Sequence, residues 1–491
     1  MTSPSRLEAD AVVIGTGAGG GPTAAVLAER GLRVVVLEAG PYLRTDDFTG
    51  DEGAMTARLY RMSLSRASGM ALYAGECVGG STVINDALCF RPPGEILAEW
   101  RGRHGLSGLT DAALAPFVDR AWRDVHAEPT DRAHASRNAE RLLRGARRLG
   151  WSGSATPRNV IGCANLGLCN LGCPSGAKQS TLVTYVPRAE RAGARVIANA
   201  RAERVGIDGG RARGVDAVTI DPATRRVTAR FRVEAPLVCL AAGALGTPVL
   251  LQRSGVAAGG GLQVHSSVHV TARFAEAIHG YYGPTMSYAV DELADVNGRT
   301  GPGVMIESVS ALPLPTATAL PGFGAEHETR MRALAHYARA LVVLRDRTRG
   351  RVAADGTVAY ALEPGDVERL RAGMAAAARA YLAAGAAEVL LPVLASRPLR
   401  TDGDCAKFAA RPLAPSELAL LYAVHLFGGA CMAGRDADGV CDERGACFGV
   451  RGLYVVDAAG LPGNTGVNPQ ITIMANALRI AEGAAAEARA T

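Results

Sequence analysis

Residues 11–20 read AVVIGTGAGG, and this stretch decides the fold. Its first four residues form a continuous apolar run, which is typical of a strand buried on both faces of a parallel sheet. Glycines follow with the spacing G-x-G-x-x-G, and the pattern predicts a helix over about residues 20–30 and a second strand over residues 32–37. Together these segments predict a complete βαβ unit at the start of the chain.

The predicted strands and helix around the glycines make their spacing informative. Glycine makes up 59 of 491 residues, so the spacing alone would be a weak signal and could mark a structural turn. Here it follows a buried strand and opens a helix, and Glu38 ends the next strand, as a dinucleotide-binding motif requires. Gly15 would make the tight turn, Gly17 would admit a pyrophosphate, and Gly20 would allow close helix packing. Glu38 would accept hydrogen bonds from an adenosine ribose, and the N–H groups of the helix N-terminus would bind the phosphates.

Composition and charge exclude several classes of protein. At 48% apolar and 20% charged residues, the chain is a folded protein rather than a disordered, collagenous or coiled-coil one. The net charge is only +6, and the arginines at positions 345–351 have no aromatic residues among them, so we expect a solvated turn and no nucleic-acid partner. No signal peptide is expected, because residues 1–10 contain no apolar run. No membrane span is expected either, because the most apolar stretch, residues 236–252, contains Gly243, Gly246 and Pro248. We therefore expect a cytoplasmic protein with reduced cysteines.

Three further segments place turns or polar groups at predicted strand ends. Residues 75–85 form a second glycine-rich turn. Residues 237–248 form a buried strand that turns through Gly243 into a helix, and residues 453–457 form a strand that closes in Asp457. In an open α/β sheet such strand ends deliver their groups to one crevice.

With these blocks the chain resembles the glucose–methanol–choline (GMC) family of FAD-dependent oxidoreductases. The matching blocks are residues 11–40, 75–92, 237–255 and 424–482, whereas residues 261–411 match loosely. Within the family the chain is most similar to cholesterol oxidases and long-chain alcohol oxidases, on the segments HLFGG at 425–429, GVNP at 466–469 and CNLGCPSGAKQST at 169–181.

The resemblance implies an α/β fold, with a Rossmann-like FAD-binding domain and an inserted substrate domain built on an antiparallel sheet flanked by helices. We expect the FAD-binding domain to comprise residues 1–110, 180–260 and 436–491, and the substrate-binding domain to comprise residues 111–179 and 261–435. The expected cofactor-binding residues are Gly15, Gly17, Ala18, Gly19, Gly20, Glu38, Ala39, Gly79, Gly80, Ser81, Thr82, Asn85, Val205, Ala242, Gly243, Asp457, Ala458, Pro469 and Gln470.

Attachment of the cofactor can also be predicted. Some family members link FAD covalently through a histidine in the block around Gly79 and Gly80. The corresponding place here holds Ile84, with Thr82 and Val83 beside it, and none of these side chains can form that bond. We therefore predict noncovalent FAD.

Alcohol oxidation by a flavin requires removal of the hydroxyl proton and transfer of a hydride from the carbinol carbon to flavin N5. By resemblance His425 is the general base, since a neutral imidazole suits this step, and Asn468 holds the substrate oxygen. Asn468-Pro469 also suits the start of a helix, whose positive end would favour negative charge on the flavin pyrimidine ring. The other eight of the nine histidines are interpreted as structural.

Glu307 and the cysteines have open interpretations. In cholesterol oxidases a substrate-domain glutamate is the base for double-bond migration, but the local likeness is weak and a solvent-facing strand residue is favoured for Glu307. Cys163, Cys169 and Cys173 have the spacing C-x5-C-x3-C, which matches no common metal motif. Buried thiols and no metal are expected for them and for the C-x5-C pair at 441–447, with a disulfide or a metal as alternatives.

The leading hypothesis is therefore FAD-dependent oxidation of an alcohol to a ketone or aldehyde, with oxygen or a quinone-like carrier as the electron acceptor. One alternative is a hydroxynitrile-lyase-like enzyme that binds FAD without net redox chemistry. Another is a flavin-binding protein with a purely structural or interaction role. The apolar segments 311–315 and 317–323 favour a lipid-like alcohol over a sugar.

Overall fold

The predicted βαβ unit forms the centre of a five-stranded parallel sheet. The computed structural model describes residues 6–131 and 134–490. Strand β2 (Ala11–Ile14), helix α1 (Gly20–Glu29) and strand β3 (Val34–Leu37) make the unit. The strand order is β22-β13-β2-β3-β9, and the added strands are β9 (Arg195–Ile197), β13 (Leu237–Leu240) and β22 (Leu453–Val455). Every residue of β2, β3, β13 and β22 is buried, which explains their unbroken apolar sequences.

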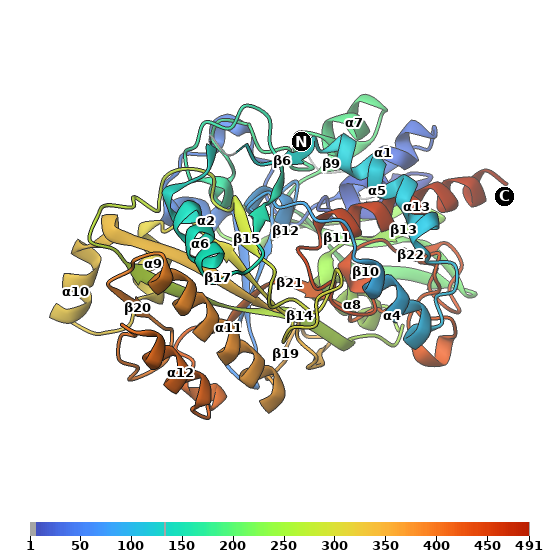
Figure 1. The fold of residues 1–491 in the computed structure, drawn as a ribbon. Helices are drawn as coiled ribbons and strands as arrows, with labels where there is room; N and C mark the ends of the chain where they lie inside the picture. Colours follow the sequence, from blue (N-terminus) through green and yellow to red (C-terminus); the bar gives the residue numbers. More distant parts are fainter. Residues whose placement is uncertain (1–5, 132–133, 491) are drawn as a thin grey trace.

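Helices cover this sheet at one end of the molecule (Figure 1). Helix α7 (Tyr185–Arg191) and the C-terminal helix α13 (Gln470–Ala490) pack on α1, and α5 (Asp111–Asp124) packs on α13. Helix α8 (Gly243–Arg253) follows β13. A four-stranded sheet of order β1-β12-β11-β10 adjoins it. Its strands are β1 (Arg6–Glu8), β10 (Ala200–Asp208), β11 (Arg211–Ile220) and β12 (Val227–Glu234).

The other end of the molecule is built on an eleven-stranded, mostly antiparallel sheet (Figure 1). Its main path is β4 (Tyr60–Leu64), β5 (Ala71–Gly75), β21 (Tyr422–Phe427), β14 (Gly260–Arg273), β17 (Tyr337–Leu344), β16 (Val304–Ser308), β15 (Tyr288–Val290) and β7 (Ser154–Ala155). Three short strands join off this path: β18 (Gly350–Val352), β19 (Val358–Ala359) and β20 (Glu388–Leu390).

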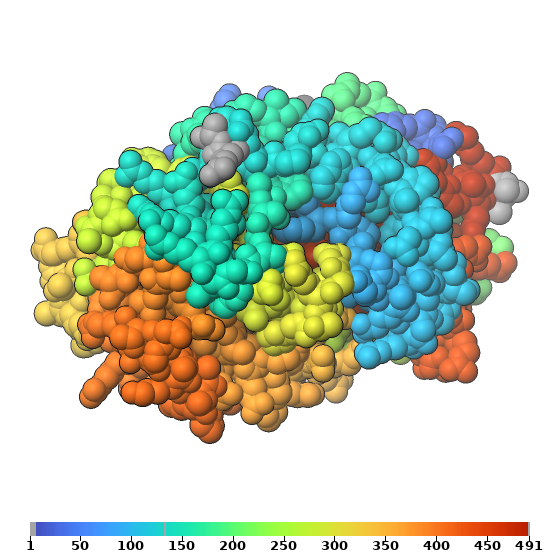
Figure 2. Space-filling model, viewed as in Figure 1, coloured from blue at the N-terminus to red at the C-terminus, as the bar shows by residue number. Residues whose placement is uncertain are grey.

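Helices α6 (Arg137–Arg148) and α11 (Pro364–Ala383) cover one face of the large sheet, and α12 (Asp402–Ala410) packs on α11. The space-filling view shows α6 in teal and the α11–α12 region in orange over this end of the molecule (Figure 2). The remaining elements are α2 (Glu52–Leu59), α3 (Ser81–Ile84), α4 (Gly94–His104), α9 (Pro313–Ala319), α10 (Ala325–Arg332), the pair β6 (Ala127–Pro129) and β8 (Pro157–Asn159), and 3-10 turns at Thr45–Asp47, Cys169–Leu171, Leu334–His336, Pro415–Glu417, Asp436–Asp438 and Ala458–Gly460.

The two faces of the large sheet differ in chemistry. On β14, Val268 and Val270 point into the core formed with α11, and on β17 Ala340 and Val342 do the same. Because side chains alternate along a strand, the residues between them point to the opposite face, toward the parallel sheet. On β14 these residues are polar: Gln263, His265, Ser267, His269 and Thr271. The large sheet therefore has a polar face, and this face points toward the parallel sheet.

The predicted fold class is confirmed, with a parallel βαβ-type sheet joined to an antiparallel sheet flanked by helices. Strand β9 pairs in parallel with β3, because α7 brings it to that edge of the sheet. The segment 41–70 contains α2 and β4. The C-terminal helix begins at Gln470, two residues after the predicted cap Asn468.

The domain division stays a prediction. Two of its segments make contacts across the proposed boundary: α5 packs on α13, and β5 pairs with β21 in the large sheet. Within residues 6–131 and 134–490, no helix combines the length and apolar character needed to cross a bilayer.

Candidate active site

A cavity of about 880 Å³ lies where the parallel sheet meets the polar face of the large sheet. The residues that follow four parallel strands line it, namely 15–19 after β2, 38–39 after β3, 241–246 after β13 and 457–458 after β22. This is the edge at which open α/β sheets bind ligands, because the carboxyl ends of parallel strands meet there. On the opposite wall, β14, β16, β17 and β21 contribute side chains from the polar face.

The glycine-rich loop after β2 has the geometry that its motif predicts. Gly15 has a φ of 102°, and a Cβ there would lie 2.3 Å from the Ala241 carbonyl oxygen. A Cβ on Gly20 would lie 1.9 Å from the Gly15 carbonyl oxygen, so close packing excludes any side chain there. At Gly17 the nearest atom would be the Gly80 Cα at 3.8 Å, so this position is open to the cavity. The loop and the uncapped N-terminus of α1 thus fit a pyrophosphate.

Two buried carboxylates hold the cavity wall in place. Glu38 accepts hydrogen bonds from Thr16 Oγ1 at 2.6 Å and from the Gly40 N–H at 3.1 Å, and burial raises the pKa of Glu38 to about 7. Asp457 accepts from the Gly243 N–H at 2.6 Å and from Thr247 Oγ1 at 2.7 Å, and burial raises the pKa of Asp457 to about 6. Asp457 therefore ties the end of β22 to the turn before α8.

Most of the predicted cofactor-binding residues line the cavity, and three do not. Gly20 packs beneath the loop, and the Gly79 N–H donates to Thr16 Oγ1 at 2.8 Å behind it. Val205 is fully buried on β10, where its N–H donates to Ser254 Oγ at 2.8 Å. Residues 200–202, at the start of the same strand, reach the cavity instead.

The structure brings the two predicted catalytic residues together. His425 stands on β21 and Asn468 immediately precedes α13, and both line the cavity. The Asn468 Nδ2 atom lies 3.5 Å from His425 Nε2. Burial lowers the pKa of His425 to about 4, so the imidazole is neutral near pH 7. A neutral ring nitrogen and an amide N–H thus face the same space.

A second histidine, which the sequence analysis treated as structural, contacts the first. His265 Nδ1 lies 3.1 Å from His425 Nδ1, and burial keeps the pKa of His265 well below its usual range. Two neutral rings at this distance share one proton in a single hydrogen bond. When His425 Nδ1 donates, its Nε2 is left as an acceptor toward the cavity.

Glu307 also belongs to this site, and the interpretation of it as a solvent-facing residue is wrong. Its side chain is completely buried, because β16 lies inside the sheet, and it lines the cavity. Burial raises the pKa of Glu307 to about 8, the nearby Asp86 carboxyl adds to this shift, and the Asn468 amide opposes it. Glu307 is therefore a protonated acid near pH 7.

Further polar residues of the cavity went unrecognised in the sequence. His269 accepts or donates a 2.7 Å hydrogen bond with the Tyr422 hydroxyl, and both line the cavity together with Arg339. The available signal was the alternation of polar and apolar residues over 263–271, which marks a strand with one polar face.

The cysteines lie apart from this chemistry. All ten fall within the described ranges, and each is a free thiol there. Cys169 Sγ accepts a hydrogen bond from Arg158 Nη2 at 3.2 Å, which accounts for part of the cluster at 163–173 as packing. In the part of the chain that the structure describes, no group of three metal-ligating side chains comes together.

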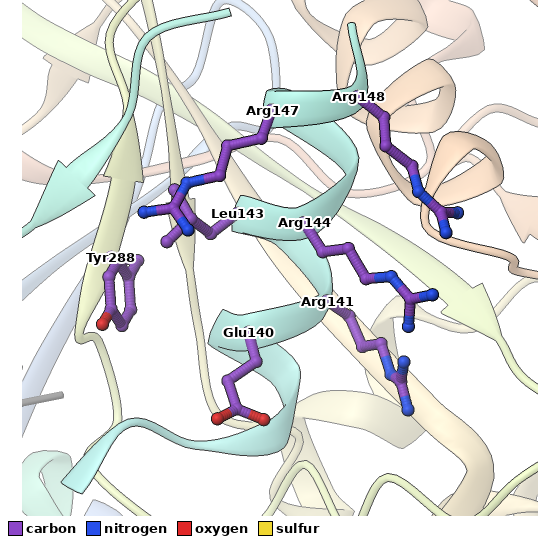
Figure 3. Close-up of a pocket in the computed structure, with 7 residues that line it drawn as sticks. All are labelled: Glu140, Arg141, Leu143, Arg144, Arg147, Arg148 and Tyr288. Atoms are coloured by element: carbon purple, nitrogen blue, oxygen red, sulfur yellow. The ribbon is translucent and has the colours of Figure 1, made fainter. Parts of the chain in front are cut away.

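A second hollow, of about 500 Å³, lies on the outer surface beside α6. Figure 3 shows Arg147 pointing to the side of Tyr288, while Arg141, Arg144 and Arg148 point away from it. Arg141 forms an ion pair with Glu276 at 2.7 Å. This hollow is lined by four arginines and Glu140 and lies away from the strand ends of the parallel sheet, so the larger cavity is the candidate active site.

Comparison with known proteins identifies one family over most of the chain. Two models described as GMC oxidoreductase match residues 14–267 and 341–477. An uncharacterized GMC-type oxidoreductase of Mycobacterium tuberculosis is 36% identical, over 98% of this chain and 76% of that protein. A long-chain-alcohol oxidase of Arabidopsis thaliana is 29% identical, over 97% of this chain and 67% of that protein. The solved pyridoxine 4-oxidase from Mesorbium loti superposes with a TM-score of 0.71 at 17% identity, over 96% of this chain and 98% of that one.

Proposed function

Because the chain belongs to the GMC oxidoreductases, a family of FAD-dependent enzymes that oxidise alcohols, we propose that it converts a CH–OH group to an aldehyde or ketone with His425 as the base. The observation that carries this proposal is the pairing of His425 Nε2 with Asn468 Nδ2, 3.5 Å apart, in the cavity at the carboxyl ends of the parallel strands. An acceptor beside a donor can bind a hydroxyl group through both its hydrogen and its oxygen.

The residues of the cavity suit FAD as the cofactor. The loop from Gly15 to the N-terminus of α1 would hold the pyrophosphate, Glu38 the ribose, and the N-terminus of α13 the flavin end. When bound, FAD supplies the acceptor for the hydride that leaves the carbinol carbon. We propose noncovalent attachment, because residues 82–84 are Thr, Val and Ile. Flavin released into the supernatant on acid precipitation supports this, and flavin that stays with the precipitate contradicts it.

The chain's own side chains handle the proton. His425 Nε2 would take the hydroxyl proton, for which its neutral state near pH 7 is suitable. Asn468 Nδ2 would donate to the substrate oxygen and keep the hydroxyl directed at His425. His265 would accept from His425 Nδ1 and so fix the tautomer in which Nε2 is free.

The cavity lining indicates a class of substrate, and the names of relatives indicate an electron acceptor. Apolar side chains line it, which supports a lipid-like alcohol as the substrate; they include Leu312, Leu314, Pro315 and Leu341. We propose oxygen as the acceptor, on the grounds that relatives bear the name oxidase. One peroxide formed per alcohol oxidised supports an oxidase, whereas turnover with a quinone-like dye and little peroxide identifies a dehydrogenase.

Anaerobic mixing of the holoenzyme with a panel of alcohols tests the whole proposal. Fatty alcohols, sterols, glycosides and polyketide-like alcohols serve as the panel, and bleaching of the flavin absorbance is the readout. At least one class should bleach the flavin with wild type and fail with His425→Asn. If no alcohol bleaches it while a cyanohydrin releases its aldehyde, the enzyme is a lyase and the proposal is wrong.

A further inference from the structure

His425 faces the cavity because strand β21 contains a β-bulge. Ala423 and Leu426 both pack against the core that contains α11, although they are three residues apart and a regular strand would place them on opposite faces. The register of β21 with β14 shifts at this point, so that two residues of β21, Val424 and His425, oppose His265 alone. The extra residue turns His425 to the cavity side of the sheet, where it lines the cavity.

A buried carboxylate holds β14 beside this bulge. The Ser266 N–H donates to Asp346 Oδ1 at 3.0 Å, and the Ser266 hydroxyl donates to Asp346 Oδ2 at 2.6 Å. Pairing of β14 with β17 stops at the neighbouring residue, where Ser267 faces Val343, so the carboxylate serves as the next acceptor along that edge of β14. The Tyr360 hydroxyl donates to Asp346 Oδ2 at 2.6 Å and keeps the carboxylate in place. Asp346 thus fixes the backbone of β14 directly beside the bulge.

The main-chain carbonyl of Asp346 holds the segment that carries Asn468. Asn464 Nδ2 donates to the Asp346 carbonyl oxygen at 2.6 Å, and the Asn464 N–H donates to Gln263 Oε1 on β14 at 3.3 Å. Asn464 lies four residues before Asn468, in a mostly buried loop that leads to α13. Asp346 therefore contacts both of the segments whose position determines where the two catalytic candidates lie.

We propose that Asp346 is a positioning residue, which sets the separation of His425 Nε2 and Asn468 Nδ2, 3.5 Å in this structure. It acts through its neighbours, because its side chain is buried and stands outside the cavity lining. Without the carboxylate, the Ser266 N–H and two hydroxyl groups would lose their acceptor, which favours relaxation of the bulge into a regular ladder. A shift of one residue would turn His425 to the opposite face of the sheet. The inference rests on the proposed function for the role of the pair.

Replacement of the carboxylate tests the proposal on the holoenzyme. Asp346→Ala should lower the rate of flavin reduction by about 10- to 100-fold, as a small misplacement of catalytic groups does, and should leave FAD affinity unchanged. Asp346→Asn should recover most of the rate. Its amide oxygen can accept from the Ser266 N–H, while the two hydroxyl groups turn to accept from its amide N–H groups. A wild-type rate in Asp346→Ala overturns the proposal, whatever stability that variant loses, because a purely structural residue would behave in this way.

Ser266→Ala tests the same contact with less risk to folding, because it removes a single hydrogen bond to Asp346. The rate of flavin reduction should fall about fivefold, the equivalent of one hydrogen bond. Ser308→Ala is the matched control and should keep the wild-type rate. Ser308 is equally buried, on β16 of the same sheet, and its hydroxyl accepts from the Ser287 and Tyr288 N–H groups at 3.3 Å. Equal rates in the two serine variants would contradict the assignment.

Nitrogen NMR of the holoenzyme with isotope-labelled histidine distinguishes failure of this inference from failure of the proposed function. The ring signals of His425 are assigned by their loss in His425→Asn. They should shift in Asp346→Ala and in Ser266→Ala, because the contact with His265 changes, while the signals of the exposed His279 stay in place. These shifts with no oxidation of any alcohol by wild type would leave the inference standing and the proposed function wrong. Unchanged His425 signals, together with alcohol oxidation that His425→Asn abolishes, would do the reverse.

Discussion

His265 Nδ1 lies 3.1 Å from His425 Nδ1, so the two rings share one hydrogen bond whose direction depends on the tautomer of each ring. Burial lowers the pKa of both rings, so near pH 7 both are neutral and only one of the two facing nitrogens carries a proton. With the proton on His425, its Nε2 is an acceptor beside the Asn468 amide. With the proton on His265, Nε2 of His425 carries a hydrogen and cannot take one. We therefore predict that His265 acts as a positioning residue for His425.

Removal of the His265 acceptor should slow proton abstraction without loss of FAD. His265→Leu is expected to lower kcat by about 10- to 100-fold, because the His425 tautomer is no longer fixed. His265→Asn keeps an oxygen near the former Nδ1 position and should recover much of the loss. Rapid-mixing measurements of flavin reduction give the rate. Equal rates in the two variants would contradict a role for the hydrogen bond.

Removal of the base itself should have a larger effect. His425→Asn is expected to lower the rate of flavin reduction by about 10²- to 10⁴-fold with FAD content unchanged, as is usual for a general base. His279→Asn is a suitable control, because His279 is exposed and stands outside the cavity lining. In wild type, kcat/KM should fall as the pH drops through about 4, where His425 becomes protonated and stops accepting. A rate for His425→Asn equal to that of His279→Asn would rule out His425 as the base.

Glu307 should make stability depend on pH in a defined direction. Its pKa is about 8 in the folded protein against an ordinary value of 4.5. Between these values the folded carboxyl keeps a proton that the unfolded one has lost, so its contribution to the free energy of unfolding falls as pH rises, by up to about 1.4 kcal/mol per pH unit. Glu307→Gln mimics the protonated acid and should gain stability relative to wild type from pH 5 to pH 8.

Urea unfolding of the FAD-saturated proteins at pH 5 and pH 8 measures this difference. Glu326→Gln is the control, since Glu326 is exposed on α10 and its substitution should change stability equally at both pH values. If the difference between Glu307→Gln and wild type is the same at pH 5 and pH 8, Glu307 is ionised in the folded protein and the assignment is wrong.

The sequence predicted the parallel sheet well because its signals are local. The run at 11–14 and the glycines after it specify strand, turn and helix within about 20 residues. The polar face of the large sheet depends instead on which strands pair and on which face α11 covers. Neither of these can be predicted from a single segment of the sequence. For that reason His265 and Arg339 were missed, and Glu307 was placed in solvent although β16 lies inside the sheet. Val205 lies behind the cavity wall on β10, whereas residues 200–202 of the same strand line the cavity.

The glycine-rich loop allows cofactor binding to be separated from folding. Gly15 has a φ of 102°, and a Cβ there would lie 2.3 Å from the Ala241 carbonyl oxygen, so Gly15→Val should destabilise the fold. At Gly17 a Cβ would meet only Gly80 Cα at 3.8 Å and would point into the space expected for the pyrophosphate. Gly17→Val should therefore fold normally and bind FAD at least about tenfold more weakly.

Thermal unfolding of the flavin-free proteins and fluorescence titration with FAD measure the two effects separately. Gly102→Ala is the matched control, because Gly102 is exposed on α4 and a Cβ there meets no atom within 4 Å. It should keep full FAD affinity and be slightly more stable, since alanine favours a helix over glycine by about 1 kcal/mol. Wild-type FAD affinity in Gly17→Val would mean that the pyrophosphate does not lie against this loop. The assignment of the whole cofactor site would then be wrong.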